Sequence, residues 1–163
     1  MLDRLLREHD AIRAFAAKFE AYLNEDLLTD VDGLAAVRWD MTKVMMQHLA
    51  FEDRFVNLPL ERDPRPHAAA IAQRFKRDLE AIQTSFEGHM ERWSSAKTAA
   101  DWVGYRRISL PQLRTLTGRM RREEDELFPL IAGCAEIASG SVPGPERNWA
   151  RSAWDVQTSL GKR

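Results

Sequence analysis

Apolar residues recur every three or four positions through the long stretches of the chain, which is the spacing of one buried face on a helix. Strands would instead alternate apolar and polar residues, and these stretches do not follow that pattern. The predicted helices cover residues 2–23, 30–56 and 65–93, and a last helix ends near residue 135. Four amphipathic helices with short connections predict an all-α fold, namely an antiparallel up-down four-helix bundle.

Capping residues and prolines set the ends of these predicted helices. Thr29 or Asp30 can cap the second helix, because their side-chain oxygens accept hydrogen bonds from free amides of the first turn. Prolines from Pro59 onward stop that helix, since proline lacks the amide hydrogen that a helix interior requires. Pro111 is expected either to kink the last helix or to start it.

A change in composition near residue 138 marks a domain boundary. Residues 1–137 are expected to form the bundle, and residues 138–163 a linker and a C-terminal segment, because 139–145 is rich in glycine, proline and serine. The segment beyond the linker contains Trp149 and Trp154, and tryptophans seldom remain in water. We expect this segment to dock on the bundle as a short helix; the alternative is a surface that binds a protein partner.

Composition restricts the classes of function. Hydrophobic residues make up 44% and charged residues 30% of the 163, which is typical of a globular chain. The net charge is −1, from 24 basic and 25 acidic residues, so no nucleic-acid partner is expected. No apolar run suits a signal peptide or a membrane span, so a cytoplasmic protein without a membrane partner is expected. Cys134 is the single cysteine, so a metal site would need His, Asp and Glu ligands.

Five ionisable residues stand on the apolar stripes, where burial without a partner would be costly. They are His9, His48, Glu52, His67 and Glu123. In an antiparallel bundle the start of the first helix lies beside the end of the second, the start of the third and the end of the fourth, so all five fall in one layer. Imidazoles and carboxylates that converge in an apolar core suit a divalent first-row metal such as iron.

Each of these residues alone has a simpler interpretation. A single histidine on an apolar stripe is more often a hydrogen-bonded core residue than a ligand, and His48 and Glu52 could be a buried pair. The coincidence of five in one layer favours the metal. A ferritin-like di-iron site is excluded, because it needs a Glu-x-x-His pair on each of two helices and the sequence has none.

The motifs around these five residues resemble the hemerythrin-like, or HHE cation-binding, family over roughly residues 1–133. The most specific of them is the Glu-Glu-x-x-Leu-Phe-Pro ending of the fourth helix. In chain order the motifs are Glu8-His9-Asp10, His48-x-x-x-Glu52, His67 and Glu123-Glu124-x-x-Leu127-Phe128-Pro129.

The resemblance implies a four-helix bundle that holds two non-haem iron ions. By position, His9 and His48 would bind one iron, His67 would bind the other, and Glu52 and Glu123 would bridge them. Roles known in the family are oxygen binding, iron storage or sensing, and response to oxygen or nitric oxide. No acid–base pair or nucleophile outside the ligand set indicates a substrate pocket, so we expect a binding or sensing protein rather than an enzyme.

Arg119 departs from the family pattern, because the family has a histidine ligand at that position. Arginine stays protonated and offers no lone pair to a metal. Either one metal remains in the half with His9 and His48, or the guanidinium replaces the second cation and pairs with Glu52 and Glu123. The second possibility would allow a metal-free structural or regulatory interaction module. In a weak internal repeat, 48–58 aligns with 119–129, and Arg119 aligns with His48.

Overall fold

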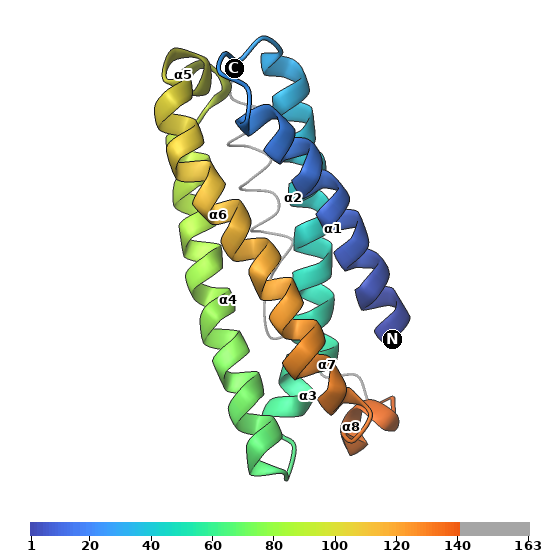
Figure 1. Cartoon of the computed structure of the whole chain (residues 1–163). Helices are drawn as coiled ribbons and strands as arrows, with labels where there is room; N and C mark the ends of the chain where they lie inside the picture. The colour runs from blue at the N-terminus through green and yellow to red at the C-terminus, as the bar shows by residue number, and fades with distance from the viewer. Residues whose placement is uncertain (141–163) are drawn as a thin grey trace.

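The computed structural model describes residues 1–140, and all regular secondary structure in that part is helical (Figure 1). The prediction of an all-α chain is confirmed there. In chain order the elements are α1 (Leu2–Leu23), α2 (Val31–Glu52), the π-helical segment η1 (Asp53–Asn57), α3 (Leu58–Glu61), α4 (Pro66–Arg92), α5 (Ser95–Ala100), α6 (Trp102–Arg122), the π-helical segment η2 (Glu123–Leu127), α7 (Phe128–Ile131) and α8 (Ala135–Ala138).

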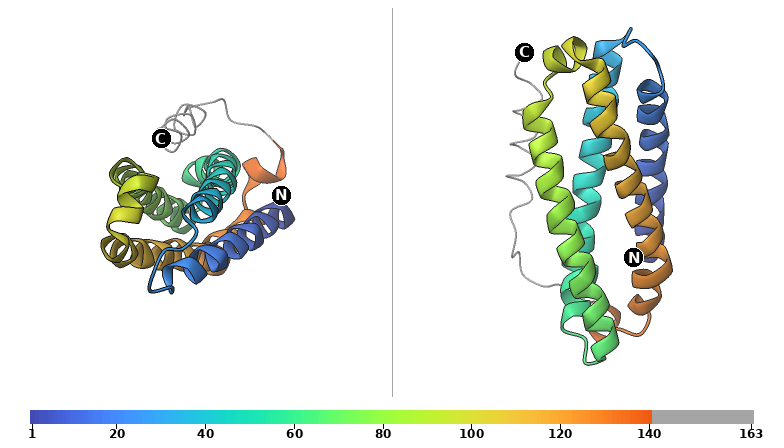
Figure 2. Two further views of the ribbon diagram at one scale, coloured as in Figure 1. Left: turned by 90° about the horizontal axis from the view of Figure 1, so that it is seen from above. Right: turned by 60° about the vertical axis from the view of Figure 1, so that its left-hand side comes forward.

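The long helices α1, α2, α4 and α6 lie side by side along one long axis, as Figures 1 and 2 show from different directions. The end of α2, the start of α4 and the end of α6 lie at the same end of the molecule, and the N-terminus lies on that side as well. No helix within residues 1–140 is both long enough and apolar enough to cross a membrane. The predicted C-terminal segment with Trp149 and Trp154 lies outside the described residues.

Side-chain caps begin two of the long helices. The Asp30 carboxylate accepts a hydrogen bond from the Gly33 amide at 2.8 Å, so the cap predicted for the second helix is present. Asp101 caps α6 in the same way through the amide of Gly104. These carboxylates satisfy amides that the first turn leaves free and interact favourably with the positive end of the helix. Pro111 lies inside α6, which continues through it.

Two π-helical segments interrupt helices that the sequence pattern predicts to be continuous. In η1 the amide of Leu58 bonds to the carbonyl of Asp53, and in η2 the amide of Phe128 bonds to the carbonyl of Glu123. A proline follows each of these donors directly, at Pro59 and Pro129. Proline has no amide hydrogen and its ring clashes with the carbonyl four residues earlier, so a wider turn accommodates it.

The core at the end of the molecule that carries these prolines is packed from α1, α2, α4 and α6 together with their short extensions. Its buried residues are Leu5, Val56, Leu60, Ala68, Ala72, Phe75, Leu127, Phe128, Ile131 and Cys134. The next layer toward the opposite end contains Ile12, Met45, Leu49, Leu79, Leu116 and Met120. Ionisable side chains that lie in this region are therefore surrounded by hydrocarbon.

Candidate metal centre

Two buried histidines face each other between α1 and α2. His9 is 0% exposed and His48 2% exposed, and their Nε2 atoms are 3.2 Å apart. Each ring turns its other nitrogen toward a carboxylate: His9 Nδ1 lies 2.7 Å from Glu124 Oε1, and His48 Nδ1 lies 3.2 Å from Glu8 Oε2. An ionised carboxylate can only accept, so these contacts favour a proton on Nδ1 of each ring. In neutral rings with that tautomer, both Nε2 atoms present lone pairs to the same point.

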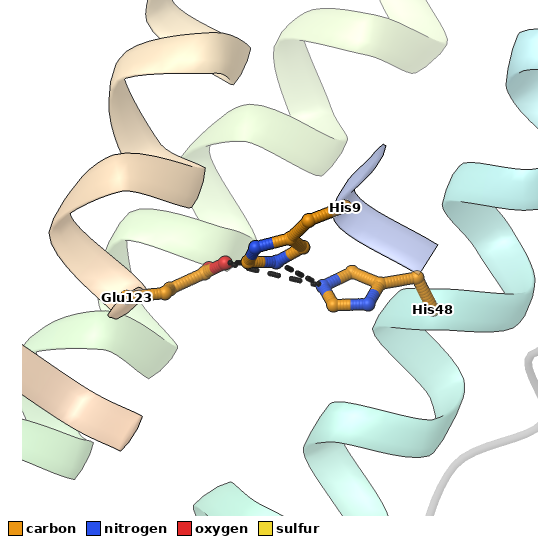
Figure 3. Close-up of side chains that lie close together, drawn as sticks. All are labelled: His9, His48 and Glu123. Atoms are coloured by element: carbon orange, nitrogen blue, oxygen red, sulfur yellow. Dashed lines mark hydrogen bonds and ion pairs between the residues drawn. The ribbon is translucent and has the colours of Figure 1, made fainter. Parts of the chain in front are cut away.

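Two carboxylates complete this group of inward-facing atoms. Glu123 Oε2 lies 3.1 Å from His9 Nε2 and 3.9 Å from His48 Nε2, as Figure 3 shows for these three side chains. Glu52 Oε2 is buried and lies 3.4 Å from His48 Nε2. A buried carboxylate oxygen needs a donor or a cation, and either a proton on His48 Nε2 or a metal ion would serve.

The spacing of these atoms matches what one metal ion requires. Bonds of about 2.1 Å place neighbouring ligand atoms about 3.0 Å apart at right angles and about 3.4 Å apart at the tetrahedral angle. The measured separations run from 3.1 to 3.9 Å. His9, His48 and Glu123 each offer a ligand atom within 4.8 Å of the others, so these residues could hold a metal ion. Glu52 Oε2 borders this set at 3.4 Å from His48 Nε2.

Arg119 occupies the opposite side of the two carboxylates and is 2% exposed. Its Nη2 lies 3.2 Å from Glu52 Oε1 and its Nε lies 2.5 Å from Glu123 Oε1. Nη1 donates to the backbone carbonyl of Phe75 at 2.7 Å, which fixes the guanidinium in place. Each glutamate therefore turns Oε1 toward the guanidinium and Oε2 toward the imidazoles. Both carboxylates bridge a permanent cation and the pair of histidines.

The buried charges of Glu52, Glu123 and Arg119 sum to one net negative charge, so one more positive charge is needed to balance them. Glu52 and Glu123 carry two negative charges, and Arg119 supplies one positive charge. Burial would raise the pKa of Glu123, but hydrogen bonds from His48 and His9 and the charge of Arg119 hold it below its ordinary value. Burial would likewise lower the pKa of His48, yet its hydrogen bonds to Glu123 and Glu52 raise it. Either a proton on His48 or a bound cation supplies the missing charge.

The π-helical segments place polar side chains around this group. Asn57, five residues after Glu52, donates from Nδ2 to Glu52 Oε1 at 3.0 Å. In an α-helix those two residues would point in directions about 140° apart, whereas the wider π turn brings them together. In η2, consecutive residues contact both nitrogens of one ring, with Glu123 at His9 Nε2 and Glu124 at His9 Nδ1. Arg13 also binds Glu124 at 2.6 Å and holds it there.

The structure brings together four of the five residues that the sequence singles out, namely His9, His48, Glu52 and Glu123. The fifth, His67, lies exposed in the first turn of α4 and does not join them. The buried face of α4 runs through Ala68, Ala72 and Phe75. At 100° per residue, His67 is turned about 80° away from Phe75, whereas Ala68 lies within about 20° of it.

Glu8, Asn57 and Glu124 belong to the surroundings of the site, although no ligand role was assigned to them from the sequence. Glu8 directly precedes His9 and Glu124 directly follows Glu123, so the sequence indicates that both glutamates lie near the site. It does not indicate their contacts, because Glu8 bonds to His48 on another helix and Glu124 reaches His9 across the interior. Asn57 depends on the π turn, which the helical periodicity does not reveal.

No protein-family model, no curated protein and no solved structure matches this chain. What the centre can do chemically is therefore inferred from its own residues. Two imidazoles whose Nδ1 atoms face carboxylates, together with the carboxylates of Glu52 and Glu123, form a buried donor set suited to one divalent transition metal.

Proposed function

We propose that this protein is a hemerythrin-like non-haem iron-binding protein, built as an up-down four-helix bundle, that binds or senses oxygen, nitric oxide or iron. One ion would be held by His9, His48, Glu52 and Glu123, and Arg119 would stand in the place of a second ion. The observation that carries the proposal is the arrangement of the imidazoles: their Nδ1 atoms lie 2.7 and 3.2 Å from carboxylate oxygens, and their Nε2 atoms converge 3.2 Å apart.

This arrangement is unfavourable unless a proton or a metal ion lies between the rings. Two neutral imidazoles whose Nδ1 atoms carry the protons would point lone pairs at each other and at two carboxylates. Carboxylate–histidine–metal chains are common in metalloproteins, because the outer carboxylate fixes the tautomer and raises the basicity of the ligand nitrogen. Glu124 and Glu8 are placed to act in this way on His9 and His48.

Metal content and iron-dependent stability test the proposal directly. Protein purified without chelators is analysed for metals, and iron binding is counted by native mass spectrometry. One ion per chain is expected. Iron at about 100 times its dissociation constant should stabilise the fold by about 2.7 kcal/mol, which corresponds to roughly 5–10 °C in melting temperature. Failure of the chain to bind iron, manganese or zinc under these conditions would contradict the proposal.

A matched pair of histidine variants locates the site. His48→Ala should abolish iron binding and the iron-dependent rise in melting temperature, because it removes one of two imidazole ligands. His67→Ala is the control, since His67 is an exposed histidine outside the group and should bind iron as the wild type does. Loss of iron binding in His67→Ala would return His67 to the ligand set and place a second ion near it.

A metal-free interaction module is the second candidate, and the contacts of Arg119 favour it. The guanidinium already neutralises part of the charge of Glu52 and Glu123, and the raised pKa of His48 allows a proton to supply the remainder. For such a module, His48→Ala would lower the melting temperature equally with and without iron. The cost would be on the order of 1–3 kcal/mol, from lost packing and unpaired carboxylates.

A further inference from the structure

A cavity of about 300 Å³ lies between α2, α4 and α6. Exposed residues Ala81, Ser85 and Thr115 stand at its rim, so it opens between α4 and α6. Its walls are largely hydrocarbon and include Phe19, Met41, Met45, Ile82, Phe86 and Leu116. Cavities of this size and polarity are typical of small-molecule sites.

The cavity also contains a buried positive charge. Arg38 lines it and is 4% exposed, and its Nη2 donates to the backbone carbonyl of Trp93 at 3.1 Å. No carboxylate within residues 1–140 forms an ion pair with this guanidinium, in contrast to Arg119. Burial lowers the pKa of Arg38, and the Tyr105 ring, whose centroid lies 5.2 Å from the guanidinium carbon, offsets only part of this effect. A buried cation without an anion is costly, so a ligand that supplies one negative charge would be strongly favoured there.

The other polar groups beside Arg38 are neutral. His89 Nε2 lies 2.9 Å from the Ser109 hydroxyl, and burial, followed by the charge of Arg38, lowers the pKa of His89 to about 4. Thr42 is occupied by a hydrogen bond to the Arg38 carbonyl. The cavity therefore offers one cation and one hydroxyl–imidazole pair. That set suits the single charge of a carboxylate better than the double charge of a phosphate.

We propose that this cavity binds an aliphatic monocarboxylic acid of medium chain length, with its carboxylate on Arg38 and its chain against the apolar walls. The volume of about 300 Å³ is within the range of sites that bind small molecules. Three methionines line the walls, and their flexible side chains adapt readily to an alkyl chain.

This site is separate from the metal centre and does not depend on it. Arg38 precedes His48 by ten residues in α2, which corresponds to about 15 Å along the helix axis. None of His9, His48, Glu52 and Glu123 lines the cavity. Loss of iron binding and loss of carboxylate binding are therefore expected to be independent results.

Decanoate is the probe, and the methionines report where it binds. With methyl-labelled methionine, the NMR signals of Met41, Met45 and Met90, which line the cavity, should shift on titration. Met1, Met46 and Met120 lie outside it and serve as internal controls. Decanol, which has the same chain without the charge, should bind at least about tenfold more weakly than decanoate.

Variants of Arg38 test the charge. Arg38→Met should weaken decanoate binding by about tenfold or more and leave decanol binding unchanged, whereas Arg114→Met, an exposed arginine on α6, should change neither. The comparison of the two ligands on wild-type protein stands even if Arg38→Met fails to fold. Equal affinity for decanoate and decanol, shifts at the control methionines alone, or no binding up to about 1 mM would each overturn the proposal.

Discussion

Replacing Arg119 with methionine removes a buried charge while keeping an unbranched side chain in its place. In the wild-type protein the guanidinium contacts Oε1 of both Glu52 and Glu123 and donates to the carbonyl of Phe75. The variant leaves Glu123 Oε1 without its cationic partner in a buried layer, while Glu52 Oε1 keeps only the hydrogen bond from Asn57. The two carboxylates then face each other without a cation between them on that side, and their repulsion opposes joint ionisation.

The expected loss of stability near neutral pH is about 3–5 kcal/mol, which is typical when one partner of a buried ion pair is removed. For a chain of this length, each kcal/mol lowers the melting temperature by roughly 2–4 °C, so a drop on the order of 10 °C is expected. Arg122→Met is the matched control. Arg122 is an exposed residue on the same helix and pairs with Asp78 at 3.0 Å, so its loss should cost less than about 1 kcal/mol.

Urea unfolding at several pH values, in the presence of a chelator, measures this effect without contributions from metal. The pKa of Glu123 is lowered in the folded state, so the stabilisation is present above its unfolded pKa and is lost as pH falls through the folded pKa. The difference between wild type and Arg119→Met should therefore be largest near pH 7 and shrink in acid. Adding Glu123→Gln to the variant should recover part of the loss. Melting temperatures that agree within about 2 °C at pH 7 would refute the reasoning.

Three further predictions concern neighbouring groups. Arg119→His restores an imidazole beside the carboxylates and should add a second bound iron ion in native mass spectrometry; an unchanged stoichiometry would contradict it. Glu124→Gln should weaken iron binding by about 10–100-fold, because the carboxylate that orients His9 is lost, whereas the exposed Asp125→Asn should not. Burial lowers the pKa of His89 to about 4, so unfolding takes up a proton between about pH 4 and 6.5. Wild-type stability should therefore fall by on the order of 3 kcal/mol as the pH is lowered from about 6.5 to about 4. His89→Gln should remove this component in urea titrations.

The period of the apolar residues was sufficient to predict an all-helical chain, because each long helix buries one continuous face. The cap of the second helix was predicted as Thr29 or Asp30, and the structure shows Asp30. Such a cap is predictable from local sequence, because the capping oxygen bonds only to amides in the first turn of the same helix. The π-helical segments were not predicted. They result from a conflict between Pro59 or Pro129 and the helical hydrogen bonds, and whether a helix ends, kinks or widens at a proline depends on tertiary packing.

The candidate site was predictable as far as its residues share a helix face and an axial level. His9, His48, Glu52 and Glu123 satisfy both conditions and lie together in the structure. His67 lies at the same axial level as the other four residues but not on the buried face of α4. With α4 starting at Pro66, the residue that points inward there is Ala68. The spacing of apolar residues defines the buried face of a helix only to within about one residue. At a helix end few apolar residues define that face, so the spacing cannot decide which of two neighbouring residues points inward.

The ion pairs of Arg119 also limit where the centre could exchange electrons. A guanidinium has a fixed charge and no accessible oxidation states, so the side of Glu52 and Glu123 that Arg119 occupies is redox-inert. In a centre of the proposed kind, His9, His48, Glu52 and Glu123 would hold one ion, and all redox chemistry would rest on that ion. Arg119 would then supply only a constant positive charge beside it, whatever the oxidation state of the ion.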